Sequence, residues 1–321
     1  MGNFSNDVES LVRIFIVISF ISSTVLFPIM IFLIVKKSKQ MKKYRFYLLN
    51  TVIWCYIYHL IVFINHINPI FPSPCVMFHP ILPLGQNAAV IMFYLAFFAI
   101  MNLDLSIVWS LFYRFSQAYP GWLCDFVDKT KYIYLVYACI YFFVYTTVLI
   151  PMMIAQRWDW NETQIQFLNS NPDLAAYVNS PMICYKNVEN FRLFELYVSI
   201  IFLVFFFVGN FLHGVLIHLT QKSRNSLLTS TYRMHMMLLT AISVQMIIGY
   251  MLLLLPVVVQ GFLIYYENEN TGRFSTVTLA LFSTHGTIDD FTMIYFIKPW
   301  RETILNWIRR PSKPPIFSNS I

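Results

Sequence analysis

Seven long apolar segments constrain the fold of this 321-residue chain more than any other feature. Each segment is long enough to cross the ~30 Å hydrocarbon core of a bilayer as a helix, which takes about 20 residues. The predicted spans are residues 11–35, 46–67, 84–112, 132–154, 191–219, 234–264 and 274–297. Because little chain is left between them, we expect an all-α integral membrane protein, a single seven-transmembrane helix bundle over residues 1–321.

The loop between the first two spans sets the expected orientation. Residues 36–45 (KKSKQMKKYR) hold six of the 22 Lys and Arg residues, and short loops rich in these residues stay on the cytoplasmic side. We therefore expect the N-terminus outside and most basic residues inside. The acidic residues follow the opposite pattern, because this orientation puts these nine outside: Asp7, Glu9, Asp159, Glu162, Asp173, Glu189, Glu195, Glu267 and Glu269.

The net charge of +7 follows from this topology. In a soluble chain such a charge would suggest nucleic acid, but here the basic residues gather where they would meet anionic lipid. We expect the lipid bilayer as a partner and no nucleic acid.

Two glycosylation sequons agree with this orientation, although they do not enter its derivation. They are Asn3-Phe4-Ser5 and Asn161-Glu162-Thr163, and such asparagines accept glycans only in the secretory lumen. Both fall outside, so Asn3 and Asn161 are predicted glycosylation sites.

The five cysteines leave one pair in an oxidising compartment. Cys55 and Cys139 lie within spans, and Cys124 lies on the cytoplasmic side. Cys75 precedes the third span and Cys184 lies late in the longest outer loop, so we expect a disulfide between them. This bond would tie the outer loop to the top of the bundle.

A short amphipathic pattern follows the last span. Trp300, Ile304, Trp307 and Ile308 repeat at helical spacing between flanking arginines. This pattern predicts an interfacial helix over residues 299–310, followed by a flexible tail at 311–321.

Four polar residues within the spans are candidates for a polar core. At 1.5 Å per residue, Asp104 and Asp289 lie near mid-membrane depth, and His285 is four residues before Asp289, on the same helix face. Gln245 on the sixth span completes the set. Two interpretations stay open: a satisfied polar network that joins helices, or a switch linked to an ion or a ligand.

Enzymatic sites find little support in the sequence. The seven histidines form no His-x-x-x-His cluster for a metal, there is no Gly-x-Ser-x-Gly elbow, and the seventh span has no lysine for a retinal Schiff base. We expect no enzyme, no metal and no cofactor. With 31 Phe, 20 Tyr and 7 Trp, an internal pocket would be mainly apolar and would suit a small hydrophobic or amphipathic ligand.

Motifs along nearly the whole chain resemble one family. They are Met41 to Asn50 (MKKYRFYLLN), the Pro/Cys/Gly region from Pro74 to Gly85, Thr231 to His235 (TYRMH) with Gln245 and Pro256, and His285-Gly286 with Lys298 to Arg301 (KPWR). Together they resemble the nematode serpentine chemoreceptors of the Str superfamily, most closely its class H and class I members. The family usually ends its seventh span with Pro-Tyr-Arg, and here Trp300 takes the place of the Tyr.

The resemblance implies a G protein-coupled receptor that senses environmental chemicals in the plasma membrane of a sensory neuron, in its cilium. Its partners would be a small, volatile or amphipathic ligand and a heterotrimeric G protein. The third span ends in Tyr113-Arg114-Phe115, without the acid that precedes this Arg in rhodopsin-like receptors. Arg114 is still expected to contact the G protein, with Lys222, Arg224 and Arg233 at the rim of the groove.

Two other classes of protein remain as alternatives. A seven-span ligand-gated channel of the insect olfactory type would keep its N-terminus in the cytosol, against the charge bias. A small-solute transporter would accumulate substrate without a G protein, and the two halves of this chain show no internal symmetry of the kind that transporters display.

Overall fold

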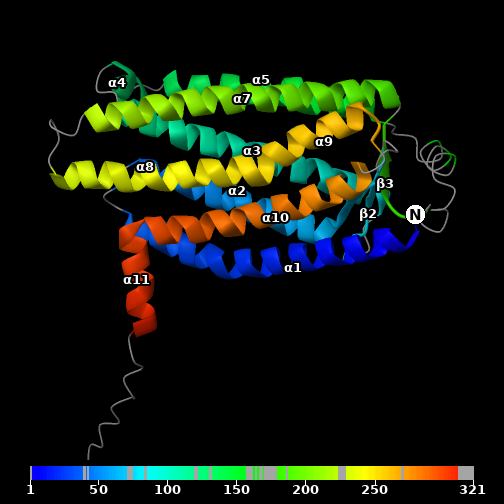
Figure 1. Ribbon diagram of the computed structural model, residues 1–321, viewed down its shortest axis with the longest axis horizontal. Coiled ribbons are helices and arrows are strands. Elements are labelled where there is room, and N and C mark those ends of the chain that lie inside the picture. The colour runs from blue at the N-terminus through cyan, green and yellow to red at the C-terminus, as the bar shows by residue number, and fades with distance from the viewer. Residues whose placement is uncertain are drawn as a thin grey trace, which may run out of the picture.

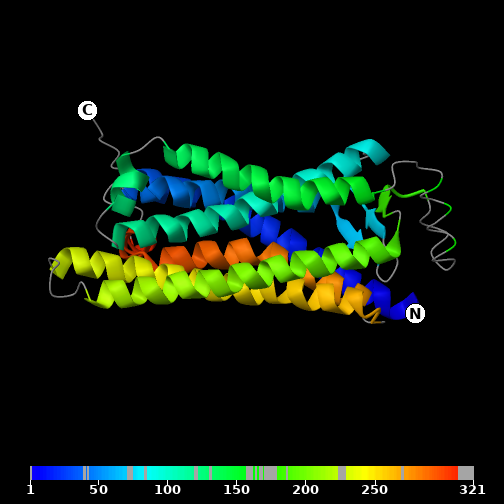
Figure 2. The ribbon, with the colours of Figure 1, turned by 90° about the horizontal axis from the view of Figure 1, so that it is seen from above.

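The computed structural model describes residues 2–38, 41, 43–70, 75–82, 85–118, 122–129, 132–156, 162, 165, 169, 179–185, 187–222, 229–268 and 271–309. Within these residues the protein is a bundle of long helices that run side by side (Figures 1 and 2). The long helices are α1 (Gly2–Phe32), α2 (Tyr44–Asn65), α3 (Gln86–Ala118), α5 (Tyr132–Ala155), α7 (Val188–Lys222), α8 (Thr229–Gly249) with its continuation α9 (Leu255–Tyr265), and α10 (Thr271–Phe296).

Six of these helices are long and apolar enough to cross a membrane. The seventh long helix, α10, is more polar because it carries His285, Asp289 and Asp290 among many Ser and Thr residues. The predicted seven-helix bundle is therefore confirmed. Several helices run beyond the predicted spans, as α7 does (188–222 against 191–219), because helical hydrogen bonding continues past the apolar core. In contrast, α2 stops at Asn65, where His66 adopts a left-handed conformation with φ of 39°.

The two ends of the bundle differ. At one end, which we call the sheet end, β1 (Ile67–Pro69), β2 (Cys75–Phe78) and β3 (Met182–Cys184) form an antiparallel sheet in the order β1-β2-β3. At the other end, the α11 end, lie the short helices α4 (Trp122–Lys129) and α11 (Lys298–Arg309), and α11 points away from the bundle (Figure 1). Neither the sheet nor α4 was predicted from the sequence.

The sheet closes its end of the bundle through two kinds of link. Cys75 and Cys184 are opposite each other in the β2–β3 pairing and form the expected disulfide. Gln86, the first residue of α3, makes two hydrogen bonds to Met182: its Nε2 donates to the carbonyl oxygen at 2.5 Å, and its Oε1 accepts from the amide at 2.9 Å. The outer loop is thereby fixed to the top of α3.

Two helices contain a widened π turn. One is η1 (Leu33–Lys37), which extends α1, and the other is η5 (Tyr250–Leu254), which joins α8 to α9. In η5 the amide of Leu255 donates to the carbonyl of Tyr250, five residues earlier. Pro256 follows directly and has no amide to donate, so the π turn accommodates it without ending the helix.

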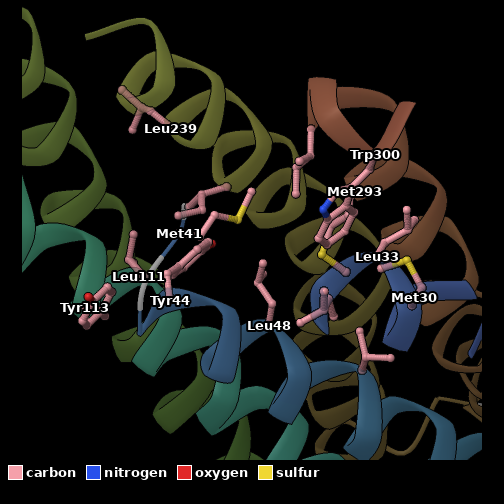
Figure 3. Close-up of a cluster of buried hydrophobic side chains, with 14 of the residues drawn as sticks. Met30, Leu33, Met41, Tyr44, Leu48, Leu111, Tyr113, Leu239, Met293 and Trp300 are labelled. Carbon is pink, nitrogen blue, oxygen red and sulfur yellow. The ribbon is translucent and has the colours of Figure 1, made fainter. Parts of the chain in front are cut away.

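The largest buried hydrophobic cluster lies towards the α11 end (Figure 3) and joins α1, α2, α3, α8 and α10. Trp300 is its largest fully buried side chain, with 0% of its surface exposed. The indole Nε1 of Trp300 donates to Ser38 Oγ at 2.8 Å, and Ser38 Oγ donates to the carbonyl of Leu33 at 3.1 Å. Trp300 thus fastens α11 to the end of α1.

Candidate functional site

A cavity of about 610 Å³ lies between α3, α5, α7 and the α8–η5–α9 helix, with part of β1 and β2 at its sheet end. Apolar side chains dominate its lining, among them Phe97 on α3, Val148 on α5, Ile201 on α7 and Leu253 in the π turn. The volume is within the range of about 300–1,000 Å³ that is usual for small-molecule sites. The bundle therefore contains a binding-sized apolar cavity, as the aromatic-rich sequence predicts.

Few polar side chains line this cavity. Asp104 comes from α3, Glu195 from α7, Gln245 from α8 and Gln260 from α9. No hydrogen-bond or ion-pair partner is found for the carboxyl of Asp104 or Glu195 in the part of the chain that the structure describes. Lys, Arg and His are missing from the described lining residues, so in this part of the chain the acidic groups of the cavity have no basic counterpart.

Glu195 is a cavity residue that was not among the candidate site residues from the sequence. It was grouped with the acids expected outside, and in the structure it lies in the second turn of α7 and lines the cavity. Near it, at the sheet end, burial raises the pKa of Tyr185 well above its usual range, and the negative charge of Glu195 raises this pKa further. An acid four residues inside a predicted span was the signal that could have identified it.

Gln245 joins the cavity to the helices behind it. Its side chain lines the cavity, and its Nε2 donates to Asp289 Oδ2 on α10 at 3.0 Å. Asp289 is 5% exposed, and its Oδ1 has no partner among the described residues. Two of the four predicted polar-core residues are therefore in direct contact, and Asp104 lies on the same cavity as Gln245.

The remaining predicted member, His285, is buried beside them but forms no hydrogen bond within the described residues. A second polar group lies nearby between α1, α2 and α10. Ser23 Oγ is 2.6 Å from His59 Nδ1 and 3.4 Å from Thr287 Oγ1. We use "polar core" for Ser23, His59, Gln245, His285, Thr287 and Asp289. Within the described residues no group of three or more His, Cys, Asp or Glu could hold a metal ion.

Gly286 allows α10 to approach α2 closely. A Cβ atom at this position would overlap Cys55 Sγ and would come within 2.8 Å of His59 Cε1. Small residues let helices approach in this way within membranes. The polar core therefore depends on the absence of a side chain at Gly286.

Arg114 is buried at the α11 end of α3, with 8% of its surface exposed. Its guanidinium carbon is 3.6 Å from the centroid of the Tyr44 ring, and Ser110 Oγ donates to the Tyr44 hydroxyl at 3.1 Å. Nε and Nη2 of Arg114 find no hydrogen-bond partner in the described residues. Among the described residues, this Tyr44–Arg114 stack holds the guanidinium at the α11 end of α3.

The other predicted G-protein contacts are only partly visible. Lys222 is exposed at the end of α7 and Arg233 is exposed on α8. Arg224 and the tail at 311–321 lie outside the described residues. The same holds for Asn161 and for the side chain of Asn3, so both glycosylation sites stay predictions.

Comparison with known proteins identifies the family. Curated proteins give no match to this chain. The family model described as "Serpentine type 7TM GPCR chemoreceptor Srh" matches residues 7–310, which include nearly all of the bundle and α11. This agrees with the class H side of the sequence resemblance. Because this match covers nearly the whole chain, the chain belongs to the Srh family of serpentine seven-transmembrane G protein-coupled chemoreceptors.

Proposed function

We propose that this chemoreceptor binds a small apolar or amphipathic compound, such as an odorant, in the cavity and activates a heterotrimeric G protein at the α11 end. The observation that carries the proposal is the double role of Gln245, which lines the cavity and also donates to Asp289 on α10. A compound in the cavity can therefore act on a hydrogen bond between two helices.

The cavity favours a compact and largely apolar ligand. Phe202 and Phe206 on α7 and Tyr250 in the π turn contribute rings to its lining. Burial of apolar surface contributes about 25 cal/mol per Å², so a small molecule gains most of its affinity here from shape and apolar contact. The polar groups would set its orientation.

Coupling of ligand binding to G-protein activation requires that the ligand favours one arrangement of the helices over another. The π turn at Tyr250–Leu254 begins five residues after Gln245 on the α8–η5–α9 helix, and both contribute to the cavity lining. A ligand that changes the Gln245–Asp289 bond would shift α8 relative to α10. Because α8 continues to Arg233 and beyond at the α11 end, this shift would reach the proposed G-protein side.

Arg114 is proposed to change its surroundings during activation. It is buried against Tyr44 in this structure, so it must leave the ring before a G protein can contact it. Lys222 and Arg233 are exposed at the same end, and Arg224 is predicted there. Such basic residues would attract an acidic partner surface. We expect this end to face the cytosol of a plasma membrane, in a sensory cilium.

The test is a screen of odorants for GTP exchange in membranes that contain the full chain and a heterotrimeric G protein. We expect an activating compound, and we expect Arg114→Ala to abolish activation while the receptor still reaches the cell surface. A normal response from Arg114→Ala would contradict the proposed contact. Uptake of solute without GTP exchange would favour a transporter, and an N-terminal epitope tag hidden on intact cells would favour a channel.

A further inference from the structure

The carboxyl groups in the cavity lining indicate which class of ligand the cavity can bind. Two carboxyl groups, Asp104 and Glu195, line a space that is otherwise mostly aliphatic and aromatic. The described part of the lining contains no Lys, Arg or His that could neutralise them. Among the described lining residues the site thus offers acidic groups and aromatic faces but no basic group, which is unfavourable for a carboxylate ligand.

A carboxyl group without a partner in an apolar environment is costly, and a bound cation reduces this cost. Aromatic faces also attract cations, and Phe202, Phe206 and Tyr250 supply such faces here. We propose that the ligand is a small organic ammonium ion with an apolar body, whose charged nitrogen pairs with Asp104. This inference rests on the proposed function, because it names the ligand class of the same cavity.

Asp104 is chosen over Glu195 because of its position along the bundle. It lies about 27 Å along α3 from Gln86 at the sheet end, at the depth of the apolar lining. Glu195 lies only seven residues into α7, close to Tyr185 beneath the sheet. A nitrogen at Asp104 therefore leaves the apolar body within the cavity that Gln245 also lines, whereas a nitrogen at Glu195 would stay near the sheet.

The experiment uses the full chain in lipid nanodiscs and three matched probes: 1-hexylamine, 1-hexanol and hexanoic acid. At neutral pH the first is a cation, the second is neutral and the third is an anion. Binding is measured by thermal stabilisation of the chain, and activation by GTP exchange on an added G protein. We expect the amine to bind at least about tenfold more tightly than the alcohol, and the acid to bind most weakly.

Substitutions then test which carboxyl group pairs with the charged nitrogen of the amine. Asp104→Asn keeps the size of the side chain and should weaken amine binding about thirtyfold, with little change for the alcohol. Asp104→Glu should retain the preference for the amine. Glu195→Gln should weaken the amine less than about threefold. The matched control is Glu189→Gln, an exposed acid on the same helix outside the cavity, which should change nothing.

Two results would overturn the inference. One is an alcohol or acid that binds the unmodified chain as tightly as the amine. The other is a preference for the amine that survives in Asp104→Asn or disappears only in Glu195→Gln. These results can be told apart from failure of the proposed function. Activation by the alcohol alone would contradict the ammonium ligand and support G-protein activation. Binding of the amine without any GTP exchange would support the ammonium ligand and contradict G-protein activation.

Discussion

The cavity and the polar core are neighbouring regions with opposite chemistry, and Gln245 belongs to both. Apart from polar residues such as Asp104 and Glu195, the cavity is lined by side chains such as Ile201 that would be equally stable against lipid. The polar core holds His285 and Asp289, which are expensive anywhere in a membrane unless they are enclosed by protein. Substitutions between apolar residues in the cavity lining should therefore change the stability of the fold little, whereas substitutions in the polar core should change it strongly.

The helices that supply these regions show the same difference. On α7, Phe207 is 67% exposed on the outside of the bundle, while Phe202 and Phe206 line the cavity. On α10, Asp289 and Asp290 are each 5% exposed. The apolar helix can meet lipid on one side and a ligand on the other, but the polar helix must have its polar face covered by its neighbours.

The largest loss of stability should come from a substitution that disrupts the packing of the polar core at Gly286. In Gly286→Ala the new Cβ overlaps Cys55 Sγ and lies against His59, so α2 and α10 must separate. We expect a loss of about 3 kcal/mol in the free energy of unfolding, from overpacking of the interface. Thermal melting of the purified chain in detergent measures this loss.

The control for this substitution is Gly214→Ala on α7, where a Cβ would meet no other atom within 4 Å. It should melt like the unmodified chain. If Gly286→Ala also melted unchanged, α2 and α10 would not approach each other as the structure has them.

A smaller loss of stability should come from removing the hydrogen bond by which Gln245 links the cavity to the polar core. Gln245→Leu removes the donor to Asp289 and leaves both carboxyl oxygens without a partner among the described residues. This should destabilise the folded chain by about 2 kcal/mol. It should also leave ligand binding within about threefold while GTP exchange falls by at least about tenfold, because apolar contacts dominate affinity and the bond carries the coupling.

Asp289→Asn is the matched variant, because its amide oxygen still accepts a hydrogen bond from Gln245. It should keep most of the activation. Equal loss of binding and activation in Gln245→Leu would mean that Gln245 serves the cavity alone and does not connect it to α10.

The smallest effect should come from the Tyr44–Arg114 stack, which lies outside both regions. Tyr44→Leu removes the ring below the guanidinium, a contact worth about 1 kcal/mol, so basal GTP exchange should rise about fivefold. Tyr44→Phe keeps the ring and should stay near the basal level. If the two variants behaved alike, the ring would not hold Arg114 in its inactive position.

The sequence predicted the polar core better than the cavity, and the reason is physical. Charged and polar residues are rare within spans, so Asp289 and Gln245 were recognised as candidates, and helical spacing placed His285 on the same face as Asp289. Their contact at 3.0 Å needed only two adjacent helices. The disulfide followed from the expected compartment alone, since Cys75 and Cys184 were the only pair on the side predicted to lie outside.

The cavity could not be located in this way. Phe207 and Phe206 are adjacent and chemically identical, yet one is exposed and the other lines the cavity. Only the packing of α3, α5, α7 and α9 decides which ring faces inward. The small sheet was also missed, because β1 and β3 have three residues each and their hydrogen-bond partners are distant in sequence.

The most direct test of ligand binding in the cavity is to measure whether an activating compound protects a residue of the cavity lining. Cysteine is introduced at Ile201, which lines the cavity, or at Phe207, which faces outward on the same helix. The labelling rate with a membrane-permeant thiol reagent is then measured with and without the compound, after subtraction of labelling of the unmodified chain. We expect the compound to protect Ile201→Cys from labelling and to leave the labelling of Phe207→Cys unchanged. Equal labelling of Ile201→Cys with and without the compound would contradict binding in the cavity.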